Sequence, residues 1–379
     1  MKMSESSISS LSISNLQLSS GGFYLYGAGH YARALLKTMR ERGLFPRAVI
    51  DRKPPFKRIQ GIPVLALSKN LNNDLPILIT ILGYPNVVAS LRDKNFTQII
   101  DAEAVFDLFP SSFRYFTVDK FLWRQPPREN QLDPGQVEQV RHLLSDEKSR
   151  RVLENLVKFR SEPTASSYPW PDKHEMCFPD DIEHLYGEDR LLVVDCGAYN
   201  GDTLRGFYER YEDKIVSYLA LEPNRANALS LKSGLEERGG AVSVLEVGVG
   251  EDNSTAWIDS AGSASAVREK HEEQNDGDFE AIKIVRVDDL VAGCDYNVLK
   301  MDIEGHELKA LHGAREFICE RHPTLVISVY HTPEHLWEIP LWVHEIAGDA
   351  YHYYLRLEGH WGLETTLYCT PKQKRRRDL

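Results

Sequence analysis

Short apolar runs recur along the C-terminal half of the chain, and each of them ends at a polar residue or a glycine. Segments with helical spacing of apolar residues separate most of these runs, and alternating strands and helices are typical of a parallel sheet. Only residues 358–363 separate the last two runs, so we expect these two to pair as an antiparallel hairpin. The predicted strands are Leu191–Asp195, Tyr218–Glu222, Val242–Val247, Asn297–Asp302, Thr324–Tyr330, Tyr351–Leu357 and Glu364–Cys369. The pattern therefore predicts an α/β fold with a seven-stranded, mostly parallel, Rossmann-like sheet.

A smaller α/β unit is predicted before this sheet. Residues 23–26 form an apolar run that ends in the turn Gly27-Ala28-Gly29, and apolar residues at helical spacing follow. Further parallel strands are expected at residues 48–50, 76–82 and 98–100. These features predict a Rossmann-like domain at residues 21–115, after a disordered arm at residues 1–20.

Between the two sheets, residues 116–185 are predicted to form a helical connector and a covering segment. Residues 131–160 have a helical pattern, and Asp133 and Pro134 suit the cap and first turn of a helix. Residues 161–189 are rich in proline, aromatic and acidic residues; they could cover a pocket or serve as an ordinary packed linker. The C-terminal domain is then expected at residues 186–379.

Composition and charge exclude several classes of function. The net charge of −11 disfavours nucleic acid as a partner, and no apolar run is long enough to span a membrane. The serine-rich N-terminus lacks the apolar core of a secretory signal, so we expect a cytoplasmic protein. The five cysteines have no close pair, which argues against a disulfide framework or a structural zinc site. Assembly into a homo-oligomer stays open.

The most informative motif, DCGAYNGDT, directly follows the first strand of the C-terminal sheet. Gly197 and Gly201 allow the backbone to turn sharply and approach a ligand, and a helix can begin at Thr203. The next strand ends at Glu222, where a carboxylate can accept hydrogen bonds from a ribose diol. This arrangement predicts an adenosine cofactor that needs no phosphate. The predicted cofactor-binding residues are Asp195, Gly197, Ala198, Gly201, Thr203, Glu222, Asn224 and Gly248.

Ionisable residues crowd the end of the fourth strand and the end of the fifth. If the fourth strand continues through Glu304, Asp302 and Glu304 share one side, where they could bind a substrate hydroxyl or a divalent cation. His331 ends the fifth strand at the same edge, as either a proton acceptor or a satisfied core histidine. Glu307 falls in the first turn of a helix, where its charge suits the helix dipole, so we expect a structural role. The candidate catalytic residues are Asp302, Glu304 and His331, and the candidate metal ligands are Asp302 and Glu304.

Taken in order, the motifs DCGAYNGDT, LEPN, VRVDDL, LKMDIEGHELKALHGA and LVISVYH resemble the FkbM family of S-adenosylmethionine-dependent methyltransferases. The resemblance covers residues 178–369, and DIEGHE is its most specific element. It implies a seven-stranded methyltransferase fold, S-adenosylmethionine as cofactor, and O-methylation of a small hydroxylated acceptor such as a sugar or a polyketide-like secondary metabolite. Asp302, Glu304 or His331 would then act as the base, or a divalent metal held by the two carboxylates would acidify the hydroxyl.

Two other functions remain as alternatives. A nicotinamide-dependent oxidoreductase could use the N-terminal glycine turn and Asp51, although Arg33 occupies the position of the third glycine in the dinucleotide-binding motif. A non-catalytic sensor of a sugar nucleotide or adenosine would bind a ligand without consuming a methyl acceptor. The N-terminal unit itself could retain a ligand site or serve a structural or dimerising role.

Overall fold

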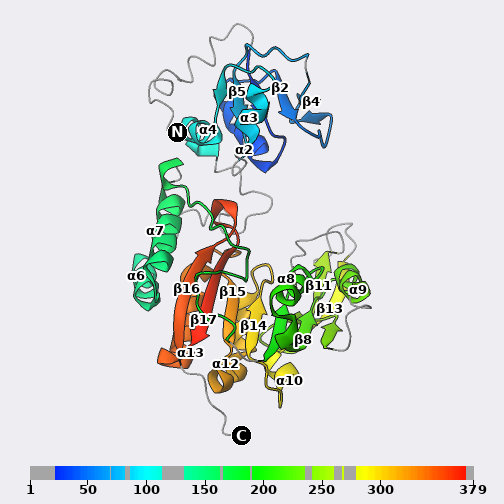
Figure 1. Cartoon of the computed structure of the whole chain (residues 1–379), viewed down its shortest axis with the longest axis vertical. Coiled ribbons are helices and arrows are strands. Elements are labelled where there is room, and N and C mark those ends of the chain that lie inside the picture. Colours follow the sequence, from blue (N-terminus) through cyan, green and yellow to red (C-terminus); the bar gives the residue numbers. More distant parts are fainter. Residues whose placement is uncertain are drawn as a thin grey trace. The chain divides into compact units, whose positions relative to one another are not determined.

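The computed structural model divides the chain into two compact units (Figure 1). Unit 1 contains the described residues of Met1–Asn130 and Asn155–Pro169, and unit 2 contains those of Gln131–Glu154 and Trp170–Leu379. The described residues are 22–68, 70–81, 86–112, 132–162, 165–187, 190–234, 241–259, 267–268 and 279–372. The predicted disordered arm at residues 1–20 lies outside these ranges. The predicted domain boundaries stay a prediction.

Unit 1 is built on a six-stranded sheet with the order β3-β4-β2-β1-β5-β6. Its strands are β1 (Tyr24–Tyr26), β2 (Ala48–Asp51), β3 (Arg58–Ile59), β4 (Ile62–Ala66), β5 (Ile77–Ile79) and β6 (Ile99–Ile100). Its helices are α2 (His30–Glu41), α3 (Asn86–Arg92), α4 (Ala102–Leu108) and the 3-10 turns η1 (Pro110–Ser112) and η3 (Ala165–Ser167). The strands are parallel except for β3, which pairs antiparallel with β4. Neither β3 nor β4 was predicted, because most of their residues are not buried and give no continuous apolar run.

Two helices, α6 (Pro134–Leu143) and α7 (Glu147–Ser161), precede the seven-stranded sheet in the chain, as the helical pattern predicts. Asp133 caps α6 because its side chain accepts hydrogen bonds from the backbone N–H groups of Gly135 and Gln136. Pro134 occupies the first turn of α6, where its missing N–H costs nothing.

Unit 2 contains the predicted seven-stranded sheet, with the order β16-β17-β15-β14-β7-β8-β9 (Figure 1). The strands are β7 (Leu191–Cys196), β8 (Ile215–Leu221), β9 (Val242–Leu245), β14 (Val298–Met301), β15 (Thr324–Ser328), β16 (Tyr351–Leu357) and β17 (Thr365–Pro371). Only β17 runs against its neighbours, so the predicted hairpin and the mostly parallel sheet are confirmed. The helices of this unit include α8 (Asp202–Tyr211), α9 (Arg225–Ser233), α10 (Val287–Val291), α11 (Glu307–His312), α12 (Arg315–Arg321) and α13 (His335–Ala347), with 3-10 turns η4 (Glu212–Lys214), η5 (Gly348–Ala350) and η6 (His360–Gly362).

A second, four-stranded sheet in unit 2 was not predicted. Its strands are β10 (Gly248–Val249), β11 (Ser254–Asp259), β12 (Val267–Arg268) and β13 (Phe279–Val285), in the order β10-β13-β11-β12. Ala256, Ile258, Ile282 and Ile284 form a small apolar core within it. The occurrence of these apolar residues at every second position of each strand was the available signal for a half-buried sheet.

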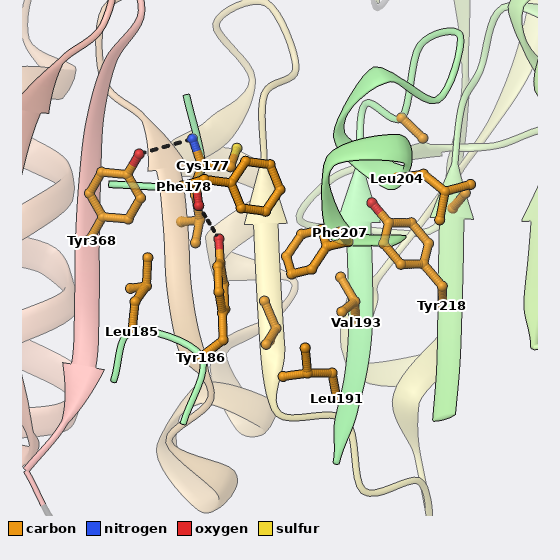
Figure 2. Close-up of a cluster of buried hydrophobic side chains, with 14 of the residues drawn as sticks. Cys177, Phe178, Leu185, Tyr186, Leu191, Val193, Leu204, Phe207, Tyr218 and Tyr368 are labelled. Carbon is orange, nitrogen blue, oxygen red and sulfur yellow. Dashed lines mark hydrogen bonds between the residues drawn. The ribbon is translucent and has the colours of Figure 1, made fainter. Parts of the chain in front are cut away.

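Residues 174–187 pack against the seven-stranded sheet and form part of its core. Figure 2 shows Phe178 and Tyr186 beside Phe207, with ring centroids 5.1 and 4.8 Å from that ring. The backbone N–H of Cys177 donates to the hydroxyl of Tyr368 on β17 at 3.0 Å. The segment is therefore an integral layer of unit 2.

A buried arginine links β16 to residues that precede β7 in the chain. The side chain of Arg356 is fully buried and donates to the carboxylates of Asp146 at 2.7 Å and Asp181 at 3.1 Å. It also donates to the hydroxyl of Ser149 at 2.8 Å. Because a buried charge without partners is costly, these contacts hold α7 and the segment around Asp181 in place.

No helix among the described residues has the length and apolarity that a membrane span requires.

Candidate active site

A cavity of about 540 Å³ lies at the carboxyl ends of β7, β8 and β14, where an open α/β sheet binds its ligands. The small four-stranded sheet contributes one wall through Val249, Ala256 and Ile284. Met176, from the predicted covering segment, also lines the cavity. The predicted residues that line it are Gly197, Thr203, Glu222, Gly248, Asp302 and Glu304. The predicted residues that do not line it are Asp195, Ala198, Gly201, Asn224 and His331.

The first glycine of the loop is required by a close approach between two strand ends. Gly197 has a φ of +80°, and a Cβ placed there would lie 2.0 Å from the backbone oxygen of Asp302. The N–H groups of Gly197 and Ala198 both donate to the backbone oxygen of Leu221. Gly201 has a φ of +81° and caps α8, so it shapes the loop without lining the cavity. The glycines therefore set the path of the loop.

Replacing Gly197 with alanine is expected to destabilise unit 2 by about 2–4 kcal/mol, because overpacking and a left-handed backbone both cost free energy. Gly293 is a matched control, since it has a φ of +75° but a Cβ added there would meet no atom within 4 Å. Gly293→Ala should cost only about 1 kcal/mol. Chemical denaturation of both variants measures the difference, and equal losses would show that the clash with Asp302 is unimportant.

Glu222 presents a fixed carboxylate at the end of β8. Its two oxygens accept hydrogen bonds from the backbone N–H groups of Tyr199 and Asn224, both at 2.8 Å. Burial raises the pKa of Glu222, although these backbone hydrogen bonds oppose the rise. Oε1 also accepts a long hydrogen bond from Nδ2 of Asn227 at 3.4 Å. A carboxylate has about four lone-pair sites, so the group can still accept hydrogen bonds from a ligand in the cavity.

Asn224 caps α9 and has no place in the cavity wall. Its side-chain oxygen accepts a hydrogen bond from the backbone N–H of Asn227 at 3.1 Å. The predicted direct contact between Asn224 and a cofactor is therefore not supported, because the side chain is buried and already engaged in the cap. Its N–H, through the bond to Glu222, helps to hold that carboxylate.

Asp195 lies beneath the glycine loop and does not line the cavity. This position differs from the predicted contact of Asp195 with a cofactor. Its fully buried carboxylate accepts a hydrogen bond from the hydroxyl of Tyr218 at 2.6 Å and pairs with Nζ of Lys300 at 2.9 Å. Lys300 also donates to the backbone oxygen of Gly197 at 2.8 Å. Burial lowers the pKa of Lys300, but the charges of Asp195 and Asp302 outweigh burial and raise it above the usual value. The pair therefore supports the loop from below.

Sequence reasoning missed Lys300, although a signal was present. A lysine inside an apolar strand is rarely buried unless it is paired. Lys300 is directly opposite Asp195 in the pairing of β14 with β7. That partner became identifiable only with the strand register.

The imidazole of His331 lies close to the other two catalytic candidates, Asp302 and Glu304. Its Nε2 lies 3.5 Å from Oδ1 of Asp302 and 3.5 Å from Oε2 of Glu304. The strand β14 ends at Met301, and Glu304 has a φ of +56°. The strand therefore does not continue through Glu304, and the two carboxylates converge through a turn instead.

Glu307 is buried next to Asp302, Glu304 and His331, and its carboxylate contacts the turn after β14 and the imidazole of His331. Its Oε1 accepts hydrogen bonds from the backbone N–H groups of Ile303 at 3.0 Å and Gly305 at 3.3 Å. The same oxygen lies 2.7 Å from Nδ1 of His331, and Oε2 lies 3.2 Å from Nδ1 of His335. These contacts agree with the structural role expected for Glu307.

Three carboxylates thus surround one imidazole. Burial opposes the charged form of His331, but Glu307, Asp302 and Glu304 outweigh burial and raise the pKa of His331 to about 9. Burial favours the neutral form of Glu307, but His331 and His335 outweigh it and hold the pKa of Glu307 well below its usual range. Burial raises the pKa of Glu304, with His331 opposing the rise. The group has an excess of negative charge.

The strand order, the reversed β17 and the cavity at the strand ends define a Rossmann-like fold of the methyltransferase type. Residues 195–356 match the family model of the methyltransferase FkbM domain, which confirms the resemblance. This match supports a methyltransferase.

The fold is shared with a solved structure. The crystal structure of methyltransferase FkbM from Methylobacillus flagellatus KT is similar over 92% of this chain and 89% of that chain. Its TM-score is 0.63 and its sequence identity is 21%, which supports the fold alone. No curated protein matches the chain.

Proposed function

We propose that the protein is an S-adenosylmethionine-dependent O-methyltransferase that acts on a hydroxyl of a small acceptor, a sugar or a polyketide-like secondary metabolite. The observation that carries this proposal is one cavity lined by Glu222 at the end of β8 and by Asp302 and Glu304 after β14. A fixed acceptor of hydrogen bonds and a pair of possible proton acceptors are the two elements that cofactor binding and methyl transfer require.

The charge of the cavity wall favours a sulfonium nucleoside over a phosphorylated one. The lining carboxylates are Asp202, Glu222, Glu251, Asp252, Asp302 and Glu304, whereas the lining lysines are Lys300 and Lys309. Lys300 is already paired with Asp195. A wall of this charge attracts a cationic sulfonium and repels a pyrophosphate, which disfavours a dinucleotide in this cavity.

In the proposed complex, the ribose hydroxyls donate to Glu222, and the amino-acid part lies along the loop at Gly197. The adenine packs in the region of Gly248, against the apolar side chains of Val249 and Ile284. The glycine at position 248 allows the backbone to pack closely against Ile284, since a Cβ there would lie 2.7 Å from that side chain.

Methyl transfer then requires alignment and the removal of one proton. An acceptor oxygen attacks the methyl carbon in line, the bond from carbon to sulfur breaks, and its electron pair stays on sulfur as S-adenosylhomocysteine leaves. The hydroxyl proton passes to Asp302 or Glu304, because these carboxylates line the cavity and His331 does not.

The proposal is tested by binding and by product. Calorimetric titration should show one S-adenosylmethionine bound per chain, and no binding of a nicotinamide dinucleotide at the same cavity. Incubation with methyl-labelled cofactor and a panel of hydroxylated sugars and polyketides should give a product heavier by one labelled methyl group. Cofactor binding without transfer to any member of a broad panel favours the sensor, and dinucleotide binding with no affinity for S-adenosylmethionine contradicts the proposal.

A further inference from the structure

We propose that Asp302, Glu304 and His331 bind one divalent transition-metal ion, with Glu307 as the residue that orients His331. This binding is a property of the chain that can be measured without any methyl acceptor. Its role in the reaction, described below, rests on the proposed function.

The geometry of the three side chains suits a shared ion. Nε2 of His331 lies 3.5 Å from one oxygen of Asp302 and from one oxygen of Glu304. Two ligand atoms at about 2.0–2.1 Å from a tetrahedral ion are separated by about 3.4 Å. The ligand atoms of Asp302, Glu307 and His331 already lie within 4.8 Å of one another. An ion between Asp302 and Nε2 of His331 therefore fits the present separations, and Glu304 would join it through an adjustment of its side chain.

The buried imidazole of His331 supports the metal site independently of the acidic residues. Its side chain is only 4% exposed, and Nε2 has no hydrogen-bond partner although it is aimed at the two carboxylates. A buried polar atom that lacks a hydrogen bond needs an explanation, and coordination of a metal ion is one such explanation. A divalent ion would displace the proton that the surrounding carboxylates favour on His331, and the lone pair so freed on Nε2 would bind the ion.

Glu307 holds the imidazole in the orientation that a metal ligand needs. Metal-binding histidines commonly donate their second ring N–H to a carboxylate, which fixes the tautomer and the direction of the other nitrogen. Nδ1 of His331 lies 2.7 Å from Glu307, which is itself held by the N–H groups of Ile303 and Gly305. The arrangement is therefore rigid before any ion arrives.

The negative charge of Asp302 and Glu304 also favours the binding of a cation. In the described part of the chain, no lysine or arginine forms an ion pair with Asp302 or Glu304. The nearby Lys300 is paired with Asp195. Two carboxylates neutralise a divalent ion, and a ligand set that includes an imidazole favours manganese, iron, cobalt or zinc over magnesium or calcium.

The site is open toward the cavity, unlike a closed structural metal site. Asp302 and Glu304 line the cavity, with 21% and 39% of their side chains exposed, whereas His331 lies behind them. An ion held here keeps coordination positions for a hydroxyl from the acceptor. Such an ion would lower the pKa of that hydroxyl. The proton would pass to an oxygen of Asp302 or Glu304 that does not bind the ion, as the new bond to the methyl carbon forms.

The test is a titration of chelator-treated full-length protein with Co²⁺, without cofactor or acceptor, followed by calorimetry and visible absorption. We expect one Co²⁺ per chain with the visible spectrum of a site of nitrogen and oxygen ligands. His331→Gln and Glu304→Gln should each weaken binding at least about 100-fold, and Glu307→Gln by about 10–100-fold. The Glu304 variant guards against misfolding, because that side chain is partly exposed.

A matched control comes from a second group that could hold an ion, formed by His174, Asp180 and Asp181. Asp181 is already paired with Lys148 and Arg356, so His174→Gln should leave Co²⁺ affinity unchanged. The proposal is overturned if the unchanged protein binds no Co²⁺ at millimolar concentration, or if binding survives either His331→Gln or Glu304→Gln. Loss of Co²⁺ binding only in His174→Gln also overturns it. None of these results depends on methyl transfer, so failure here leaves the proposed function standing, and the reverse also holds.

Discussion

Glu222→Ala is expected to weaken S-adenosylmethionine binding by about 100-fold or more. Two hydrogen bonds from ribose hydroxyls to a carboxylate contribute about 1.5–3 kcal/mol each, and about 1.4 kcal/mol corresponds to a tenfold change in affinity. The substitution also frees the backbone N–H groups of Tyr199 and Asn224, which the carboxylate now holds. Isothermal titration calorimetry with the cofactor measures the loss.

The matched control for this prediction is Glu246→Ala. Glu246 follows the neighbouring strand β9, pairs with Lys232 at 2.8 Å and does not line the cavity. Its removal should change cofactor affinity by less than about threefold, in keeping with the small contribution of an exposed ion pair. If Glu222→Ala binds the cofactor as tightly as Glu246→Ala does, the ribose is held elsewhere.

Asp302→Asn is expected to lower the rate of methyl transfer by about 100-fold or more while cofactor affinity stays within about threefold. The amide has the shape of the carboxylate but neither its charge nor its basicity, and loss of a positioned base typically costs a factor of about 10²–10⁴. Single-turnover measurements with labelled cofactor report the chemical step, and calorimetry reports binding.

Asp295→Asn tests whether the same change matters elsewhere near β14. Asp295 precedes the amino end of that strand, at the opposite end from Asp302, and pairs with Arg321 at 3.1 Å. This variant should keep both the rate and the affinity. Equal losses of rate and cofactor affinity in Asp302→Asn would mean that Asp302 holds the cofactor and has no separate part in the transfer.

Most of the main sheet could be predicted because buried parallel strands are continuous apolar runs, and such runs are visible in one sequence. The strand Leu191–Cys196 is an example. The antiparallel hairpin of β16 and β17 was predictable because the segment between these two apolar runs is too short for a crossover helix. The four-stranded sheet was missed because β10 has only two residues and its partners alternate between apolar and polar positions. The sequence signal there is weaker than that of a buried strand.

The candidate site was predictable where it depended on the ends of strands. Glu222 and Asp302 follow apolar runs, and parallel strands bring their carboxyl ends to one edge. The partners of Asp195 depend on strand register, which places Lys300 opposite it. The meeting of Glu304 with His331 depends on a left-handed residue in a turn, which no periodic pattern reveals.

The burial of Arg356 limits how the protein can be dissected. Its guanidinium relies on Asp146, Ser149 and Asp181, all of which come before the first strand of the main sheet. A fragment that starts at residue 186 would keep the arginine and discard every one of these partners. Unpaired charge in a protein interior is among the most damaging defects known, so autonomous folding must begin upstream of Asp146.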